Sequence, residues 1–362
     1  MHPFQENIQT WLSRKLANHT RNQCLDIPFI LSSDIGLIRN ENQDRAAALY
    51  TGGKSINPLF VMAVADGMGG MRDGGRCSTL ALSSFFYSLI QHRNLGTKER
   101  ACEAIKASNS QVFDIYRGDG GSTLTAVLLD SQGKTVIVHL GDTRIYTFGP
   151  GKKVERHTTD DSLVEAVGGS GRELLQFVGM GESMQPKISE LPFMEGFCAI
   201  TTDGIHEIEE RTLNRILENS ANINEASERL NYVSMWCGGN DNSTSAIFDM
   251  GKTFSSLARY DGNGIRLWDA GGDLTTLWLR EEDQAFHAKQ ARTPNGAGEA
   301  ESNSPHPLPS SNPPDFESVQ NKPKSPARRT RKKKENSFPE KIQLDIEIGN
   351  SDEEGEVGVD RK

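Results

Sequence analysis

The chain has 362 residues, of which only 35% are hydrophobic, so it is long enough for one large domain with additions, and we expect part of it not to fold. Its net charge of −9 argues against nucleic acid as the main partner of the whole molecule. The five scattered cysteines, the missing secretory signal pattern and the lack of a bilayer-long apolar stretch argue against a disulfide framework, a zinc site and a membrane span, so we expect a cytoplasmic protein.

Residues 1–24 form an N-terminal extension of mostly polar composition. Ile8, Trp11, Leu12 and Leu16 follow helical spacing within it. We expect a helix that packs on the domain surface, and a partner-binding helix is the alternative. The pattern of a globular domain begins near residue 25.

The first half of the globular region alternates short apolar runs with polar loops. Strands are predicted over residues 28–31, 46–50 and 59–65. The last of these runs is apolar throughout, which is typical of a strand buried on both faces. Helices are predicted over residues 75–90 and 97–116, the second one capped by Thr97.

The second half contains more strands, and a glycine-rich segment interrupts them. An antiparallel meander is predicted over residues 123–129, 135–140 and 144–148. Residues 160–185 are expected to form a flap with a short helix at residues 162–167. Further elements are predicted as a strand at 197–202, helices at 212–217 and 223–236, and a closing strand at 243–248.

Four aspartates stand at boundaries of predicted strands: Asp66, Asp203 and Asp241, each next to Gly or Asn, and Asp44. They are far apart in the chain and meet only if the strand ends converge. Converged carboxylates repel one another unless cations bind between them. Glycines after Asp66 let the backbone approach a ligand closely. Oxygen ligands of this kind suit Mg2+ or Mn2+, and two such ions that share one Asp are a standard arrangement for hydrolysing phosphate esters.

Seven short motifs follow one another between residues 25 and 250. They are Arg39-x-x-Asn42-Gln43-Asp44, Asp66-Gly-Met-Gly-Gly70, Gly121-Ser-Thr-Leu-Thr125, His139-Leu-Gly-Asp142-Thr-Arg144, Thr158-x-Asp160, Thr202-Asp203-Gly204 and Gly239-Asn-Asp241-Asn242. As an ordered set they resemble the metal-dependent protein phosphatases of the protein phosphatase 2C family, in their bacterial style. The resemblance implies an α+β fold, a four-layer α-β-β-α sandwich of two antiparallel sheets.

The resemblance also implies a set of metal ligands. Asp66 would bridge two ions, Mn2+ or Mg2+, with the carbonyl of Gly67 on one of them. Asp203 and Asp241 would complete the shell of the first ion. Asp44 would serve the second ion, directly or through water.

Two further roles and three departures complete the comparison with the family. Asp160 matches a position that in bacterial relatives helps to hold a third, weaker metal, and Arg39 would grip the substrate phosphate with its guanidinium fork. Gln43 stands where many relatives have Glu. Met68 stands where some have a His that protonates the leaving group, and Asp161 stands where His is common.

Other polar residues of these motifs have structural interpretations. Asp142 is expected to be a turn carboxylate that binds nearby backbone amides. Arg144 is expected to pair with a neighbouring acid, and His139 and His206 to be buried histidines with satisfied hydrogen bonds. Residues 121–125 are expected to be core and turn.

The chain continues beyond the domain of residues 25–251. Residues 252–287 are expected to form a small β appendage, with a docking surface as the alternative, and residues 288–362 a disordered tail. The basic run 328–334 is expected to be a solvated linker; the alternatives are contact with an anionic membrane or nucleic acid, or a tether near phosphorylated partners. Residues 341–348 alternate with period two, as in a strand that adds to a sheet edge, its own or a partner's.

We therefore predict a hydrolase of phosphoserine and phosphothreonine on proteins, in which a metal-activated water attacks phosphorus directly and the reaction opposes a Ser/Thr kinase. The partners would be phosphorylated proteins, with a kinase or other protein on the C-terminal tail. One alternative is a weakly active or inactive phosphatase-like adaptor that acts through its tail. The other is a two-metal phosphoesterase for small molecules.

Overall fold

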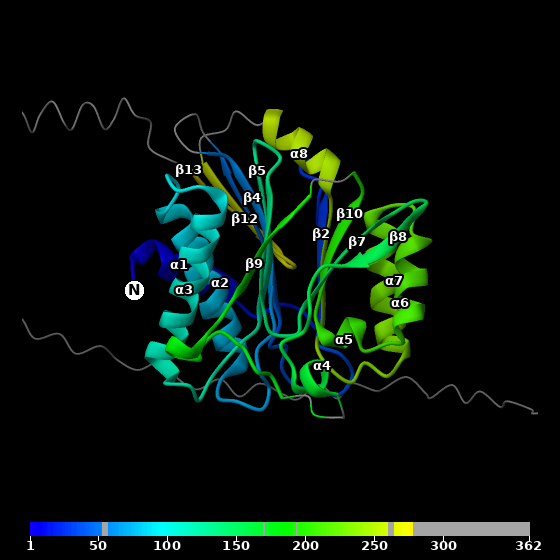
Figure 1. Cartoon of the computed structure of the whole chain (residues 1–362), viewed down its shortest axis with the longest axis horizontal. Coiled ribbons are helices and arrows are strands. Elements are labelled where there is room, and N and C mark those ends of the chain that lie inside the picture. Colours follow the sequence, from blue (N-terminus) through cyan, green and yellow to red (C-terminus); the bar gives the residue numbers. More distant parts are fainter. Residues whose placement is uncertain (53–56, 169–170, 172, 193–194, 260–263, 278–362) are drawn as a thin grey trace, which may run out of the picture. The chain divides into compact units, whose positions relative to one another are not determined.

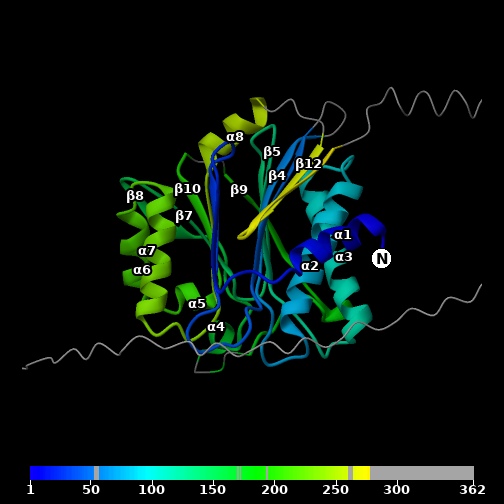
Figure 2. The same cartoon turned by 180° about the vertical axis from the view of Figure 1, so that it is seen from behind.

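The computed structural model describes residues 1–277 apart from 53–56, 169–170, 172, 193–194 and 260–263. In this part of the chain two antiparallel sheets pack face to face, and helices cover the outer face of each (Figures 1 and 2). The predicted four-layer α-β-β-α sandwich is confirmed.

The first sheet contains the strand that precedes Asp203 and the strand that follows Asp241. In spatial order its strands are β1 (His19–Cys24), β2 (Phe29–Asp34), β11 (Ser243–Asp249), β10 (Phe197–Thr201), β7 (Arg144–Gly149) and β8 (Lys152–Arg156). The two edge strands, β1 and β8, were not predicted. Both are largely polar and partly exposed, so neither shows the apolar alternation from which strands are recognised.

In the second sheet, Asp44 directly precedes one strand and Asp66 directly follows another. In spatial order its strands are β13 (Gly272–Leu277), β12 (Gly264–Asp269), β3 (Arg45–Gly52), β4 (Leu59–Ala65), β5 (Leu124–Asp130), β6 (Thr135–Leu140) and β9 (Lys187–Leu191). The predicted meander over residues 123–148 is wrong in its third strand. β5 pairs with β6, but β7 crosses to the first sheet, where Ile145 lies opposite Ile200 of β10. Sequence spacing cannot distinguish a hairpin from such a crossing.

Helices pack on the two outer faces and at the ends of the sandwich. On the second sheet lie α1 (Pro3–Leu12), α2 (Gly74–Gln91) and α3 (Thr97–Tyr116), and on the first lie α6 (Glu210–Glu218) and α7 (Ile223–Trp236). The shorter helices are α4 (Leu163–Val167), α5 (Asp203–His206), α8 (Met250–Arg259) and the 3-10 turn η1 (Gly181–Ser183). Thr97 does not cap α3: the cap is Gly96, and the Thr97 hydroxyl donates to Asp130 Oδ2 at 2.7 Å.

The strand β4 explains why an unbroken apolar run forms a strand here. Phe60 and the alternate residues of β4 after it face the other sheet. Val61 and its alternate residues on either side face α2. Between the sheets the rings of Phe29 and Phe60 lie 5.7 Å apart, and those of Phe60 and Phe248 lie 5.4 Å apart. Because both faces of β4 are covered, its end at Asp66 is held in a fixed position at one end of the sandwich.

The N-terminal extension and the last described strands pack against each other. Arg14 Nη2 donates to Asp269 Oδ1 at 2.7 Å, and Asn22 Nδ2 donates to the carbonyl of Asp269 at 2.8 Å. β12 is hydrogen-bonded along β3, so the predicted β appendage forms the edge of the second sheet, with Trp268 buried. α1 packs on α2 through Ile8 and Leu12, as a surface helix was predicted to do.

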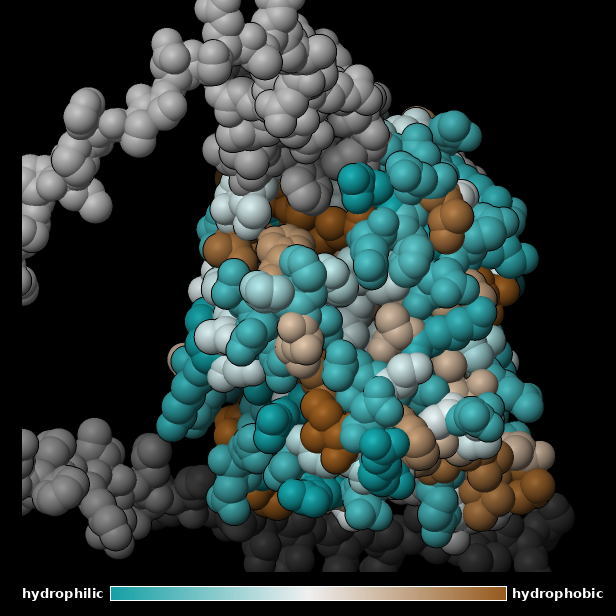
Figure 3. Space-filling model, turned by 90° about the vertical axis from the view of Figure 1, so that its left-hand side faces the viewer, coloured by the Kyte–Doolittle hydropathy of each residue, from teal (hydrophilic) through white to brown (hydrophobic). Residues whose placement is uncertain are grey.

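The predictions for residues 278–362, which include the tail, the basic run and the possible docking strand, lie outside the described residues. Among the described helices none combines the length and apolar character that crossing a bilayer requires. The five cysteines are all free thiols. On the face that includes α1 and α3, hydrophilic residues dominate and hydrophobic ones form small separate patches (Figure 3).

Candidate active site

A pocket of about 340 Å3 brings together five of the seven predicted site residues. Its lining includes Arg39, Asp66, Gly67, Asp203 and Asp241. Asp66 follows β4, Asp203 follows β10, and Asp241 lies just before β11, so all three carboxylates come from strand boundaries at one end of the sandwich. The remaining two predicted residues, Asp44 and Asp160, lie next to this pocket but do not line it.

Asp44 lies behind the pocket at the start of β3 and is 2% exposed. Its Oδ2 accepts a hydrogen bond from the Thr202 hydroxyl at 2.8 Å, while its Oδ1 is buried without a hydrogen-bond partner. A buried carboxylate oxygen without a donor is costly unless something else binds it. It is therefore a candidate metal ligand on structural grounds.

The side chain of Asn242 ties the loops of the site together. Its Nδ2 donates to the carbonyls of Ile35 and Glu41 at 2.9 and 3.0 Å, and its Oδ1 accepts from the backbone N–H of Gln43 at 2.8 Å. The loop before Asp44 is thus fixed to the loop after Asp241. This is the physical reason for an Asn directly after Asp241.

The end of β4 is anchored by the next strand. The backbone N–H of Asp66 donates to the Thr123 hydroxyl at 2.9 Å, and the N–H of Thr123 donates to the carbonyl of Asp66 at 2.8 Å. The Ser122 hydroxyl donates to the same carbonyl at 2.8 Å. Residues 121–125 are buried, so their expected role as core and turn agrees with the structure.

Gly67 lies where the chain after Asp66 meets the first turn of α2. A Cβ atom at this position would lie 2.3 Å from the carbonyl oxygen of Gly74, far inside contact distance. Only glycine therefore lets the backbone pass so close to α2. The result is a main-chain segment held directly beside the Asp66 carboxylate.

The buried carboxylates oppose one another's ionisation. Burial raises the pKa of Asp44 to about 7. The pKa of Asp66 is raised well above its usual value by burial and then by the charges of Asp44 and Asp203. Burial, followed by the charges of Asp142 and Asp241, does the same to the pKa of Asp203. Such a group of negative charges is stable only with protons or cations among them.

Asp142 is a site residue that our sequence interpretation missed. It lines the same pocket as Asp66 and Asp203, and burial, followed by the charge of Asp160, raises its pKa to about 6. The signal was present, because Leu140-Gly141-Asp142 repeats the pattern of a buried strand that ends in Gly and Asp. The sequence favours a turn at this position because an Asp beside Gly most often belongs to a turn.

Arg39 points into the pocket from the loop after β2. Its Nη2 lies 2.5 Å from Asp241 Oδ2, and this hydrogen bond raises the pKa of the guanidinium. The Arg39 side chain is 44% exposed, so the fork remains reachable from solvent. Among the residues that the structure describes, it is the one cationic side chain in the lining of this pocket.

The donor set fits divalent cations that prefer oxygen. Carboxylates from four strand boundaries, one of them with an orphaned buried oxygen, are the ligands that Mg2+ and Mn2+ take. Among the described residues no three Asp, Glu, His or Cys side chains are yet arranged as a metal-ligand group. One of these carboxylates, that of Asp241, is bound to Arg39 in the structure.

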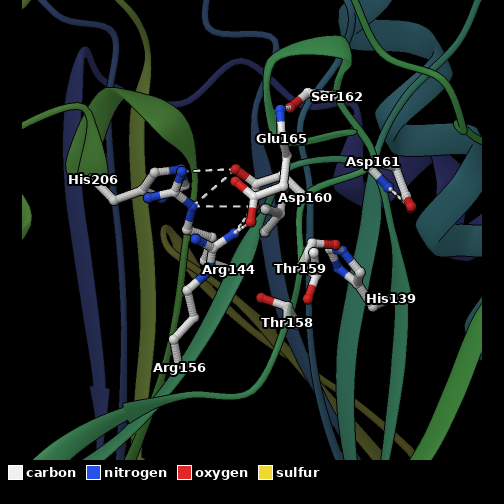
Figure 4. A network of polar contacts seen from close by, with 12 residues as sticks. His139, Arg144, Arg156, Thr158, Thr159, Asp160, Asp161, Ser162, Glu165 and His206 are labelled. Atoms are coloured by element: carbon white, nitrogen blue, oxygen red, sulfur yellow. Dashed lines mark hydrogen bonds and ion pairs between the residues drawn. The ribbon is translucent and has the colours of Figure 1, made fainter. Parts of the chain in front are cut away.

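Asp160 lies in a neighbouring pocket of about 370 Å3, which shares Asp142 and Asp203 with the first one. Two arginines bind its carboxylate from one side (Figure 4): Arg144 Nη2 lies 2.7 Å from Oδ2, and Arg156 Nη2 lies 2.6 Å from Oδ1. The expected pairing of Arg144 with an acid is confirmed. The role of Asp160 in a third metal site stays a prediction, and these ion pairs compete with it.

His139 and His206 have hydrogen-bond partners. His139 Nδ1 lies 2.9 Å from the Thr125 hydroxyl, and His206 Nδ1 lies 2.9 Å from the Thr201 hydroxyl. Burial lowers the pKa of both rings. Both are therefore neutral, structural histidines, as the sequence indicated.

A family comparison decides what class of protein this site belongs to. The model of the family described as protein phosphatase 2C matches residues 39–234, more than half of the chain. The chain belongs to the protein phosphatase 2C family. It is a serine/threonine protein phosphatase by this membership. No match was found among curated proteins.

Solved phosphatase structures share the fold of this protein phosphatase 2C member. The Mycobacterium tuberculosis serine/threonine phosphatase PstP/Ppp is 24% identical with a TM-score of 0.53, covering 62% of this chain and 98% of its own. The PPM Ser-Thr phosphatase MsPP from Mycobacterium smegmatis, in complex with cacodylate, is 25% identical with a TM-score of 0.52, covering 64% and 100%. The catalytic domain of PstP in complex with two manganese ions is 24% identical with a TM-score of 0.51, covering 64% and 98%.

Proposed function

We propose that this phosphatase hydrolyses phosphoserine and phosphothreonine on proteins with two divalent ions, Mn2+ or Mg2+, and so reverses the action of a Ser/Thr kinase. The observation that supports the proposal best is the meeting of Asp66, Asp203 and Asp241 with Arg39 in one pocket of a protein phosphatase 2C domain. A related catalytic domain, that of PstP, has been solved with two manganese ions.

The positions of the carboxylates suggest which of them would hold each ion. Asp66 is central, because the charges of Asp44, Asp203 and Asp241 all act on it. Asp203 and Asp241 would hold one ion with the main chain at Gly67, and Asp44 would serve the other through its unpartnered Oδ1. When bound, two such ions neutralise the phosphate and lower the pKa of a water between them.

Arg39 would orient the phosphate. Its guanidinium presents parallel N–H groups, a geometry that matches two oxygens of a phosphate. In the structure, Nη2 of this guanidinium lies 2.5 Å from Asp241 Oδ2. We infer that Arg39 exchanges this partner for the phosphate when Asp241 is engaged by a cation.

The departing serine or threonine oxygen needs a proton. Met68 lies beside the pocket at the position where some relatives have a His, and a thioether cannot donate a proton. His139 and His206 are neutral and bonded to threonine hydroxyls. The proton would therefore come from a metal-bound water or from solvent.

The test is hydrolysis of p-nitrophenyl phosphate and of a phosphothreonine peptide with Mn2+, compared between wild type and Asp66→Asn. We expect the variant to lose at least about a hundredfold in rate with both substrates, because it removes the shared ligand. Asp249→Asn is the matched control, since Asp249 lies at the opposite end of β11 and its acceptor to Lys252 N–H survives as an amide oxygen. Full turnover of Asp66→Asn in excess Mn2+ would contradict the site assignment.

The same assay, with nucleotides added as a third class of substrate, separates the two alternative functions. An adaptor without activity would leave both substrates intact. A small-molecule phosphoesterase would cleave nucleotides faster than the phosphopeptide. The proposal requires Mn2+-dependent cleavage of the phosphopeptide at least as fast as that of nucleotides.

A further inference from the structure

Exposed apolar side chains directly precede Arg39 in the chain, and another one stands at the end of α7. Leu37 and Ile38, which directly precede Arg39, are each 66% exposed. Trp236, at the end of α7, is 89% exposed, more than any other large hydrophobic residue in the described part of the chain. Single exposed apolar residues are common on proteins, but a group beside a catalytic pocket points to a binding surface.

Leu37 and the last turn of α7 both adjoin Gly239. The side chains of Leu37 and Met235 both lie against Gly239, with Leu37 Cγ 3.0 Å and Met235 Sδ 3.3 Å from the position of a Cβ placed there. Trp236 follows Met235 in the chain. We call Leu37, Ile38, Met235 and Trp236 the apolar rim.

The loop that presents Leu37 and Ile38 is held rigidly. The N–H of Leu37 donates to the carbonyl of Gly239 at 2.7 Å, and the N–H of Ile35 donates to the carbonyl of Asn18 at 2.8 Å. Gly36 has φ +79°, and a Cβ there would lie 2.4 Å from the carbonyl oxygen of Asp241. The two apolar side chains are therefore kept in solvent by a fixed backbone and not by a loose loop.

A groove of about 300 Å3 lies next to the catalytic pocket and shares Asp241 with it. Its lining comes from the start of α6 and from the end of α7 and the loop after it, and it includes Gly239, against which Leu37 and Met235 lie. Asp241 also lines the catalytic pocket and holds Arg39. Ile38 adjoins Arg39 in the chain and Leu37 lies against Gly239 of the groove, so a peptide whose phosphate reaches Arg39 passes close to these side chains.

Resting on the proposed function, we propose that the apolar rim selects phosphoproteins that carry bulky aliphatic residues within two positions of the phosphorylated serine or threonine. An extended peptide advances about 3.3 Å per residue, so a side chain one or two positions away lies about 3 to 7 Å from the phosphorylated residue. A Leu or Ile at that distance would cover Ile38 and Leu37 and remove apolar surface from water on both sides.

The experiment compares two phosphoserine peptides of equal length and charge, with Leu and Ile or with Ser and Asn beside the phosphoserine, and p-nitrophenyl phosphate as a substrate without flanking residues. For the wild-type chain in Mn2+ we expect kcat/KM to be about tenfold higher for the apolar peptide. In Leu37→Ser/Ile38→Ser that ratio should fall to about one, while hydrolysis of p-nitrophenyl phosphate falls far less.

Two further variants make the result decisive. Ile38→Ser alone keeps the contact of Leu37 at Gly239. If the double variant has a lowered Tm, this single variant tests the peptide preference in its place. It should lose most of that preference. Leu25→Ser is the matched control, because Leu25 is 81% exposed in the turn at the far end of β2, and it should keep the wild-type ratio.

Equal kcat/KM for the two peptides in wild type, or a preference that survives in Ile38→Ser and in the double variant, overturns this inference alone as long as p-nitrophenyl phosphate is hydrolysed. An equal loss in Leu25→Ser also overturns it. If the wild-type chain hydrolyses none of the three substrates in Mn2+, the proposed function fails and the inference fails with it.

Discussion

Asp142 illustrates how a single carboxylate in this phosphatase is governed by its neighbours. It shares the catalytic pocket with Asp66 and Asp203, and burial raises its pKa to about 6. A carboxyl whose pKa is raised on folding stabilises the fold below its unfolded pKa of about 4, and this contribution is lost as the pH rises through about 6. The ionised carboxylate of Asp142 therefore lowers the stability of the metal-free fold at neutral pH.

We predict from this that Asp142→Asn stabilises the metal-free protein at pH 8 by on the order of 2 kcal/mol and has little effect at pH 4. The measurement is urea unfolding in EDTA at both pH values. Asp119→Asn, which removes an exposed carboxyl, should change the free energy of unfolding at neither pH. A stabilisation of the same size at pH 4 would show that the effect is not one of charge.

Asp160 is the opposite case, because two guanidinium groups neutralise it. Arg144 and Arg156 bind its two oxygens, and the Asp160 side chain is 6% exposed. Replacement of Arg144 by Met should destabilise the fold by about 3 kcal/mol, because it strips a buried carboxylate of its bidentate partner. Adding Asp160→Asn to that variant should recover part of the loss, which unfolding curves of the single and double variants will measure.

The same ion pairs make a prediction about metal binding. If Asp160 is committed to its arginines, Asp160→Asn should change the Mn2+ concentration for half-maximal activity by less than the roughly tenfold that an outer ligand typically contributes. A much larger increase would show that Asp160 leaves the arginines to bind a third ion. Mn2+ titrations of wild type and variant, followed by calorimetry as well as by activity, distinguish these results.

At the scale of elements, the extension at the start of the chain and the hairpin β12–β13 support each other. Asp269 is 3% exposed, accepts from Arg14 at 2.7 Å and also from the N–H of Gly271 at 2.8 Å within the hairpin turn. Because β12 lies along β3, this link also braces the strand that begins next to Asp44. Neither segment lies within the residues that match the family, 39–234.

Asp269→Ala should therefore cost about 2 to 4 kcal/mol of stability, since it leaves Arg14 and the turn N–H without their acceptor. Asp269→Asn should cost less, because it keeps an acceptor for the turn. Asp26→Ala is a suitable comparison: Asp26 pairs with Arg266 at 3.7 Å but is 80% exposed, so its loss should stay within about 0.5 kcal/mol. Urea unfolding of the three variants decides between these expectations.

For the whole molecule, divalent ions and folding should be coupled. The candidate ligands come from four places in the chain and two sheets, so an ion that binds them holds the sandwich closed at that end. We predict that Mn2+ at 100 times its dissociation constant raises the free energy of unfolding by about 2.7 kcal/mol. Asp203→Asn should lose most of that gain, while Asp249→Asn should keep it; a gain of equal size in Asp203→Asn would contradict the ligand assignment.

Some helices and strands could be predicted from the local sequence because their own apolar pattern and end residues determine where they form. β4 was predicted with the observed bounds because a short, wholly apolar run can only be covered on both sides, and α7 because its apolar stripe and its Asn222 cap mark its extent. The motifs around Asp66, Asp203 and Asp241 indicated an aspartate at each of three strand boundaries. Edge strands such as β8 were missed because half-exposed polar residues carry no periodic signal.

What the tertiary structure alone decided is how distant segments meet. The crossing of β7 into the first sheet, the docking of β12 on β3 and the approach of Asp142 to Asp66 and Asp203 depend on pairing between residues far apart in the chain. Such pairing is set by the packing of whole sheets, which no local pattern encodes. The amino-acid sequence by itself determined the fold class, the family resemblance and most of the carboxylates. Burial and mutual charge, which exist only after folding, decided which of them share a pocket and which, like Asp160, are already paired.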